Sequence, residues 1–185
     1  RNSQTRKLLE TNTLLELEVN IRKQIENELK EVNRELKLIS SRDGLTGLAN
    51  RRYYDEYIAT EWERMAREKK PLSIVICDVD YFKKYNDAYG HLGGDECLRS
   101  IAEVISCACK RPADLAARYG GEEFAVILPD TNTAGARIVA ENIRSGVERL
   151  SITHSESEIG HITISIGIST CLPIYGGDPG SLVQS

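Results

Sequence analysis

Two apolar stretches joined by a Gly-Gly pair restrict the possible fold more than any other feature of this chain. The stretches cover residues 115–119 and 123–128, and Gly120-Gly121 lies between them. Glycine reaches positive φ without steric cost, so a glycine pair between two strand-like runs is typical of a tight turn. We therefore predict a β-hairpin at this position.

Two adjacent acids, Glu122 and Glu123, stand at the tip of this hairpin. Successive strand side chains point to opposite faces of a sheet, so the two carboxylates cannot both be buried alike. At a tip, however, both can converge on an object held above it, and a hard cation that carries phosphates suits such a pair. The alternative is an ordinary exposed hairpin with a solvated acidic end.

A second acidic pair, Asp78 and Asp80, follows a nearly continuous apolar run at 72–79 that is typical of a central strand. A carboxylate at a strand end can meet the hairpin carboxylates, and such a cluster is costly unless a cation neutralises it. Alternation places both aspartates on one face and turns the carbonyl of Val79 toward the other. We predict Asp78 as a metal ligand, whereas for Asp80 an N-cap of the following helix is an equal alternative.

The residues that follow this acidic pair suit a nucleotide. Lys83 and Lys84 lie within about one helical turn of Asp80, where they can meet phosphate oxygens. Asn86 offers a donor and an acceptor together and Asp95 only acceptors, a combination that matches guanine better than adenine. The alternatives are a helix C-cap at Asn86 and an N-cap at Asp95.

The other elements complete an α+β domain. Asn50 is predicted to cap a helix whose inner face carries Tyr54, Ile58, Trp62 and Met65. We predict helices at 51–69, 81–88, 95–109 and 133–149, a loop at 89–95 and a last strand at 162–169. The order β-α-α-β-β-α-β predicts a central sheet flanked by helices, of ferredoxin-like or palm type.

Residues 1–40 contain neither glycine nor proline and have the composition of a long helix. Apolar side chains recur along this segment at Leu14, Leu17, Ile21, Ile25, Leu29, Val32, Leu36 and Ile39. Their spacing departs from a strict heptad near the middle, which predicts a locally unwound coil. We expect the stripe to be buried in a parallel dimeric coiled coil, with a single helix packed on its own domain as the alternative.

Composition narrows the class of protein. The net charge of −4 argues against a general nucleic-acid binder. Five cysteines without a CxxC pattern indicate reduced residues in a cytoplasmic protein. No apolar run approaches the roughly 20 residues that span a bilayer, and no signal peptide is present. Because the chain begins without methionine inside a helical pattern, we interpret it as a fragment with a further domain upstream.

Five motifs in order resemble those of the GGDEF diguanylate cyclases, and the resemblance covers residues 41–172. They are GGEEF at 120–124, DGLTGLANRR at 43–52, DVDYFKKYND at 78–87, GH at 90–91 with GDE at 94–96, and TISIG at 163–167. The resemblance implies a palm-like antiparallel sheet and the condensation of two GTP into cyclic di-GMP and two pyrophosphates. It is strongest to response-regulator cyclases, which implies an upstream receiver or other sensor domain.

The resemblance also implies roles for single residues. Asp78 and the Val79 carbonyl would bind Mg²⁺ (or Mn²⁺) together with Glu122, with two ions in each active site and Glu123 as a further ligand. Glu122 would also be the general base for the ribose 3′-hydroxyl, and Lys83 would stabilise charge in the transition state. The positions that would bind GTP are Phe82, Asn86, His91 and Asp95.

Arg111 and Asp114 match the RxxD motif that binds inhibitory product in this family. An arginine can hold phosphate or guanine through two hydrogen bonds, and an aspartate can accept from the N–H groups of guanine. The alternative is a surface ion pair across a turn. This chain ends at Ser185, where family members continue into a phosphate-binding helix, so we interpret the catalytic domain 41–185 as truncated.

The favoured function is a product-inhibited diguanylate cyclase that works as a homodimer through the stalk 1–40. Each palm holds one GTP, so two palms must face each other for bond formation. The alternative is a regulatory module that binds GTP or cyclic di-GMP without turnover. A dimerising stalk with an inert globular cap is a third possibility.

Overall fold

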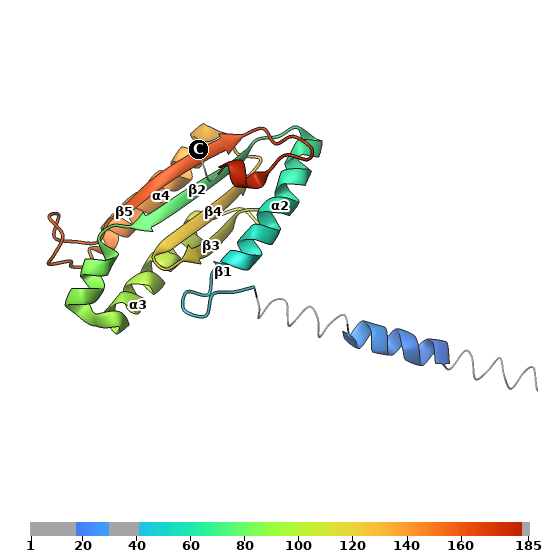
Figure 1. Cartoon of the computed structure of the whole chain (residues 1–185), viewed down its shortest axis with the longest axis horizontal. Coiled ribbons are helices and arrows are strands. Elements are labelled where there is room, and N and C mark those ends of the chain that lie inside the picture. Colours follow the sequence, from blue (N-terminus) through green and yellow to red (C-terminus); the bar gives the residue numbers. More distant parts are fainter. Residues whose placement is uncertain (1–17, 30–40, 183–185) are drawn as a thin grey trace, which may run out of the picture. The chain divides into compact units, whose positions relative to one another are not determined.

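The computed structural model describes residues 18–29 and 41–182. The chain divides into two compact units, Arg1–Ser40 and Ser41–Ser185. In the first unit, residues 18–29 are helical, as predicted (Figure 1). The side chains of Ile21, Ile25 and Leu29 are 45%, 58% and 59% exposed. The rest of the predicted stalk helix lies outside the described residues, and the coiled coil stays a prediction.

The second unit is built on one five-stranded sheet with the order β1-β3-β4-β2-β5 (Figure 1). The strands are β1 Ala49–Asn50, β2 Leu72–Val79, β3 Leu115–Gly120, β4 Glu123–Pro129 and β5 Ile164–Cys171. Only β1 runs parallel to its neighbour, β3, while the other three pairings are antiparallel. The predicted α+β palm-like fold is therefore confirmed, with β1 as an addition that its two residues gave no periodicity to reveal.

Helices cover both faces of this sheet (Figure 1). They are α2 Arg51–Glu68, α3 Phe82–Ala108 and α4 Thr133–Leu150, followed by the short 3-10 helix η1 Pro179–Leu182. Alternate residues of β2 and β4 enter two separate apolar clusters, one with α3 and α4 and the other with α2 and Leu182. Because both faces of β2 are buried, its sequence is a nearly continuous apolar run.

The helix α2 follows its prediction closely. The Asn50 side chain accepts a hydrogen bond from the Tyr53 amide at 3.0 Å and caps the first turn. The predicted inner-face residues Tyr54, Ile58, Trp62 and Met65 are all buried. The helix ends at Lys69, which takes a left-handed conformation with φ of 54° before Pro71.

The region after β2 differs from the prediction, because α3 runs from Phe82 to Ala108 with a kink instead of a loop at 89–95. Gly90 absorbs the change of direction with φ of 74° and ψ of 165°. Gly94 makes room for the continuation, because a Cβ at this position would lie 1.9 Å from Oδ1 of Asn86. Of the glycines that suggested a loop, Gly90 therefore forms a kink and Gly94 allows a close contact with Asn86.

Candidate functional site

The ends of β2 and β4 bring the predicted acids to one place. Asp78 pairs with Glu123 on β4 and with Ser165 on β5 in the strand register. Asp78 and Glu123 both continue the alternation of the face that packs on α2, so their side chains share that face. Glu122 lies in the turn after Gly121, whose φ is 51°. Glu122 is half-buried and Glu123 exposed, so the prediction that they differ in burial is confirmed.

The electrostatics of this corner favour a cation. The pKa of Asp78 is raised above its ordinary value by burial and by the nearby carboxylates of Glu122, Glu123 and Asp80. Within 18–29 and 41–182, no group of three or more acidic, histidine or cysteine side chains is arranged to hold a metal ion by itself. Mg²⁺ is commonly bound by one or two carboxylates together with substrate phosphates, and the donors here fit that shared arrangement.

Asp80 ties the end of β2 to β5 and does not cap α3. Its carboxylate accepts hydrogen bonds from the Thr163 hydroxyl at 2.7 Å and the Ser165 hydroxyl at 2.5 Å. Its amide donates to the Thr163 carbonyl at 3.0 Å. The cap position belongs to Tyr81, whose φ is 57° and whose side chain makes no capping bond. The capping alternative for Asp80 is therefore wrong, and the alternation of two hydroxyl residues, Thr163 just before β5 and Ser165 within it, was the available signal.

The start of α3 lies just after Asp80 and has no side-chain cap. The amides of Phe82, Lys83 and Lys84 come before the first i to i−4 bond, which the Tyr85 amide makes to the Tyr81 carbonyl at 3.1 Å. No side chain caps them. Free amides and the helix dipole both favour negative charge at a helix N-terminus. Lys83 and Lys84 are exposed on this turn, and the ammonium of Lys84 lies 5.0 Å from the centroid of the Tyr81 ring.

The kink in α3 places the predicted base-reading residues close together. Residues eight apart on a straight helix are separated by about 12 Å, yet the Asn86 amide is packed against Gly94. Asp95 follows Gly94 directly and is half-buried, as is Asn86. His91 lies just beyond the kink and is exposed. Asn86 therefore caps no helix end, and both side chains remain available for the predicted role.

A link between the hairpin and the turn before α2 was not predicted. Arg118 of β3 donates to the Gly121 carbonyl at 2.9 Å, and its guanidinium lies 3.2 Å from the Asp43 carboxylate. Asp43 also accepts from the hydroxyl and the amide of Thr46. Burial alone would raise the pKa of Asp43, but the hydrogen bonds from Thr46 and Arg118 outweigh it and lower the pKa. The pair holds the turn that carries Glu122.

Replacing Asp43 with asparagine is expected to destabilise the domain by about 1–2 kcal/mol at pH 7, because Arg118 loses a charged, partly buried partner. A lowered pKa means that the carboxylate stabilises the fold above the pKa of the unfolded chain and loses this contribution as the pH falls. The difference in free energy of unfolding between wild type and variant should therefore shrink as the pH falls from about 5 to about 3. Urea unfolding at several pH values measures it.

Asp55→Asn, an exposed aspartate on α2, serves as the matched control for this measurement. Its stability should follow that of the wild type at every pH. If Asp43→Asn loses the same free energy of unfolding at pH 3 as at pH 7, the role assigned to the charge of Asp43 is contradicted.

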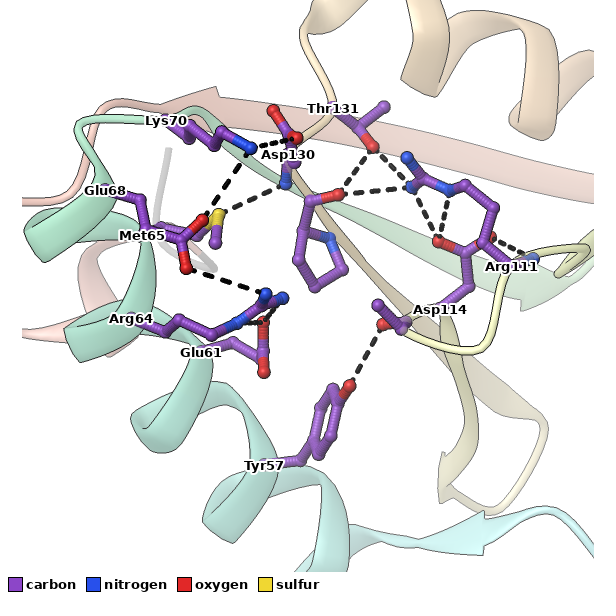
Figure 2. A network of polar contacts seen from close by, with 12 residues as sticks. Tyr57, Glu61, Arg64, Met65, Glu68, Lys70, Arg111, Asp114, Asp130 and Thr131 are labelled. Atoms are coloured by element: carbon purple, nitrogen blue, oxygen red, sulfur yellow. Dashed lines mark hydrogen bonds and ion pairs between the residues drawn. The ribbon is translucent and has the colours of Figure 1, made fainter.

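Arg111 and Asp114 pair with each other across a turn (Figure 2). Two guanidinium nitrogens donate to Asp114 Oδ1 at 2.6 and 3.0 Å, and the Asp114 side chain is only 3% exposed. Arg111 also donates to the Thr131 hydroxyl at 2.6 Å and to the Pro129 carbonyl at 3.2 Å. The structure thus shows the ion pair that the sequence left open, while binding of product by these residues stays a prediction.

Within the described segments, no helix combines the length and apolar character needed to cross a membrane.

Comparisons with known proteins agree with this arrangement. The family described as "Diguanylate cyclase, GGDEF domain" matches residues 40–185. Diguanylate cyclase A of Treponema denticola is 50% identical over 103 residues, which cover 56% of this chain and 27% of that protein. The response regulator PleD of Caulobacter vibrioides is 44% identical over 128 residues, which cover 69% of this chain and 28% of PleD. The chain thus spans about 28% of the length of these relatives.

Solved structures give the same result. The coiled coil and GGDEF domain of DgcB from Caulobacter crescentus, in complex with c-di-GMP, superimposes with a TM-score of 0.76 and 29% identity. The match covers 92% of this chain and 88% of that one. Because the family match extends over residues 40–185 and the fold and strand-end acids agree with it, the chain belongs to the GGDEF domain family of diguanylate cyclases.

Proposed function

We propose that this protein is a diguanylate cyclase that condenses two GTP into cyclic di-GMP and releases two pyrophosphates. The observation that carries the proposal is the corner where burial and the carboxylates of Glu122 and Glu123 raise the pKa of Asp78, next to the uncapped start of α3. Carboxylates that repel one another next to free amides suit a cation that carries an anionic group. A nucleoside triphosphate with a divalent metal has that composition.

In this proposal Asp78, the Val79 carbonyl, Glu122 and Glu123 hold Mg²⁺ or Mn²⁺, with two ions expected in each site. Such ions neutralise phosphate charge and lower the pKa of a bound hydroxyl. Glu122 is proposed as the general base, and its position on the turn and its half-buried side chain support this role. Lys83, exposed on the first turn of α3, supplies positive charge to the phosphates.

The base of GTP is proposed to lie against the kink of α3. The Asn86 amide offers a donor and an acceptor, and the Asp95 carboxylate accepts from the N–H donors of guanine. The contact of Asn86 with Gly94, the residue before Asp95, supports a shared role for the two side chains at one base. Phe82 and His91 complete the proposed GTP site.

Bond formation between two GTP molecules requires two such sites to face each other, so the active species is proposed to be a homodimer joined through residues 1–40. A structure of DgcB that contains a coiled coil and a GGDEF domain supports the coiled-coil part of this proposal. The signal is proposed to come from an upstream receiver or other sensor domain, since PleD, a response regulator, is among the relatives.

The test is to incubate the full chain with GTP and Mg²⁺ and to identify cyclic di-GMP by mass spectrometry. Formation of cyclic di-GMP, lost in Glu122→Gln, is the expected result. GTP binding without product would favour the alternative, a regulatory module that binds GTP or cyclic di-GMP. Wild-type turnover by Glu122→Gln would remove this residue from the proposed mechanism.

Product inhibition through Arg111 and Asp114 gives a further prediction. Arg111→Ala should raise the cyclic di-GMP concentration for half-inhibition at least about 10-fold, because a bidentate charged contact contributes roughly 1.5–3 kcal/mol. The same change should lower the free energy of unfolding, since the Asp114 carboxylate is buried and loses its partner. Progress curves with added product and urea unfolding measure the two effects.

Lys70→Ala provides the control, because it removes an exposed ion pair with Asp130 in the same polar network (Figure 2). It should leave inhibition and stability close to wild type. If Arg111→Ala is destabilised but inhibited like the wild type, the pair is structural only.

A further inference from the structure

The loop between α4 and β5 contains a buried histidine that no step above uses. His154 is 0% exposed, although it lies in an irregular segment at 151–163. Backbone hydrogen bonds shape the loop around it: the His154 amide donates to the Gly160 carbonyl at 3.0 Å, and the Ser157 amide donates to the His154 carbonyl at 3.2 Å. The Ile162 amide donates to the Ile152 carbonyl at 2.9 Å and closes the loop. These bonds fix the backbone on both sides of the buried ring.

One ring nitrogen of His154 reaches the turn that follows β2. Its Nε2 lies 3.3 Å from the Tyr81 carbonyl oxygen. A carbonyl can only accept, so Nε2 must carry the proton. Nδ1 is buried and has no hydrogen-bond partner among the described residues. The tautomer with its proton on Nε2 therefore satisfies this geometry.

The bonded carbonyl belongs to a strained residue. Tyr81 has φ of 57°, a conformation that is unfavourable for a side chain other than glycine and persists only where the surroundings enforce it. On one side, Asp80 is fixed by Thr163 and Ser165. On the other side, the Tyr81 carbonyl accepts from His154 and from the Tyr85 amide. The turn between β2 and α3 is therefore held from two directions.

Aromatic contacts also join the loop 151–163 to α3. The His154 ring meets the Tyr85 ring edge-on, with centroids 5.3 Å apart and an interplanar angle of 90°. Tyr85 stacks on Tyr89 at 4.6 Å, and the Tyr89 hydroxyl accepts from the Ser155 amide at 3.1 Å. The loop thus contacts α3 at its cap and along its first two turns.

We propose that His154 is a positioning residue for the nucleotide site: by holding the Tyr81 carbonyl, it sets the direction of the first-turn amides and of Lys83 toward the triphosphate. The inference rests on the proposed function for the identity of the nucleotide. It predicts that loss of the Nε2 donor weakens nucleotide binding and turnover, even where the fold persists.

The test compares His154→Phe, which keeps a ring against Tyr85 and removes the donor, with His154→Gln, which retains an N–H donor at a similar reach. The affinity of the full chain for α,β-methylene GTP with Mg²⁺ is measured by calorimetry, and kcat and KM are measured with GTP. Because one hydrogen bond is lost, His154→Phe should lose up to about 10-fold in affinity and in kcat/KM. The affinity and the kcat/KM of His154→Gln should lie within about 3-fold of the wild-type values.

The matched control is His161→Phe in the same loop. Nε2 of His161 is also buried without a described partner, but His161 has no bond to Tyr81, so affinity should stay at the wild-type level. If His154→Phe does not fold, His154→Asn replaces it, because its amide is one methylene too short to reach the carbonyl. Wild-type affinity in the donor-free variant overturns the proposal, as does a loss that glutamine does not restore.

These outcomes separate the two proposals. A wild-type chain that binds the analogue but makes no cyclic di-GMP removes the proposed cyclase activity, and the affinities of the His154 variants then still decide the role of this residue. An active wild type whose His154→Phe variant has unchanged kcat/KM removes the positioning role alone.

Discussion

Replacing Asp78 with asparagine is expected to abolish cyclic di-GMP synthesis and, at the same time, to stabilise the protein in the absence of metal. Asp78 lies where β2 ends, opposite Glu123 in the register, and supplies the central carboxylate of the proposed metal site. Metal ions contribute several kcal/mol to catalysis of this kind, so loss of a charged ligand should reduce turnover about 1,000-fold.

The opposite effect on stability follows from the raised pKa of Asp78. A carboxyl group with a raised pKa in the folded state favours folding while it is protonated, and this contribution is lost as the pH rises through the folded-state pKa. Once ionised, the group therefore opposes folding, because it is partly desolvated and faces Glu122 and Glu123. Asparagine removes that repulsion, and the melting temperature of the metal-free variant should exceed that of wild type by an amount that grows as the pH rises above 3.8, the ordinary value.

Thermal unfolding is measured once with EDTA and once with Mg²⁺ and α,β-methylene GTP, which gives the melting temperatures of both proteins without and with ligands. With the ligands present, the wild type should melt at a higher temperature than Asp78→Asn, because only the wild type binds them tightly and gains stability by mass action. Asp87→Asn, which changes an exposed aspartate on α3, should leave both turnover and melting temperature close to wild type. A metal-free Asp78→Asn that melts below wild type would contradict the like-charge argument.

The parts of the fold that the sequence predicted well are those with strong local signals. The run at 72–79 became β2 because every second residue packs on one face and the others on the opposite face, so its middle, Ile74–Cys77, carries no polar side chain. Asn50 caps α2 through its own side chain, a bond between residues three apart. The hairpin formed because Gly121 takes positive φ. Each of these features depends on neighbours in the sequence.

The parts that the sequence did not reveal depend on residues far apart in the chain. Asp80 bonds to hydroxyls 83 and 85 residues away, and a local pattern could only suggest a cap. Asp43 and Arg118 are 75 residues apart, so their link across the hairpin had no local signal. The kink at Gly90 was misread as a loop, because several glycines in a short stretch do not show which of them takes positive φ. The role proposed for His154 is of the same kind, since its partner lies 73 residues earlier.

Replacing Leu29 with aspartate is expected to make cyclase activity depend steeply on protein concentration. Ile21, Ile25 and Leu29 form an apolar stripe on helix 18–29, and each is at least 45% exposed within the described residues. If this stripe is the seam of a parallel dimer, aspartate at Leu29 places two like charges in the buried seam. Loss of a buried leucine from each helix costs about 2–5 kcal/mol, so the dimer should dissociate at least about 1,000-fold more readily.

Light scattering and initial rates over a dilution series measure the oligomeric state and the activity of the same samples. Leu29→Asp should lose activity at dilute protein and regain it as the concentration rises, because the unit Ser41–Ser185, which holds the proposed GTP site, is unchanged. Lys23→Gln, which alters the net charge by the same amount on the opposite side of the helix, should stay dimeric and active at every concentration. A monomeric Leu29→Asp with full activity would show that residues 1–40 are not needed to bring two GTP sites together.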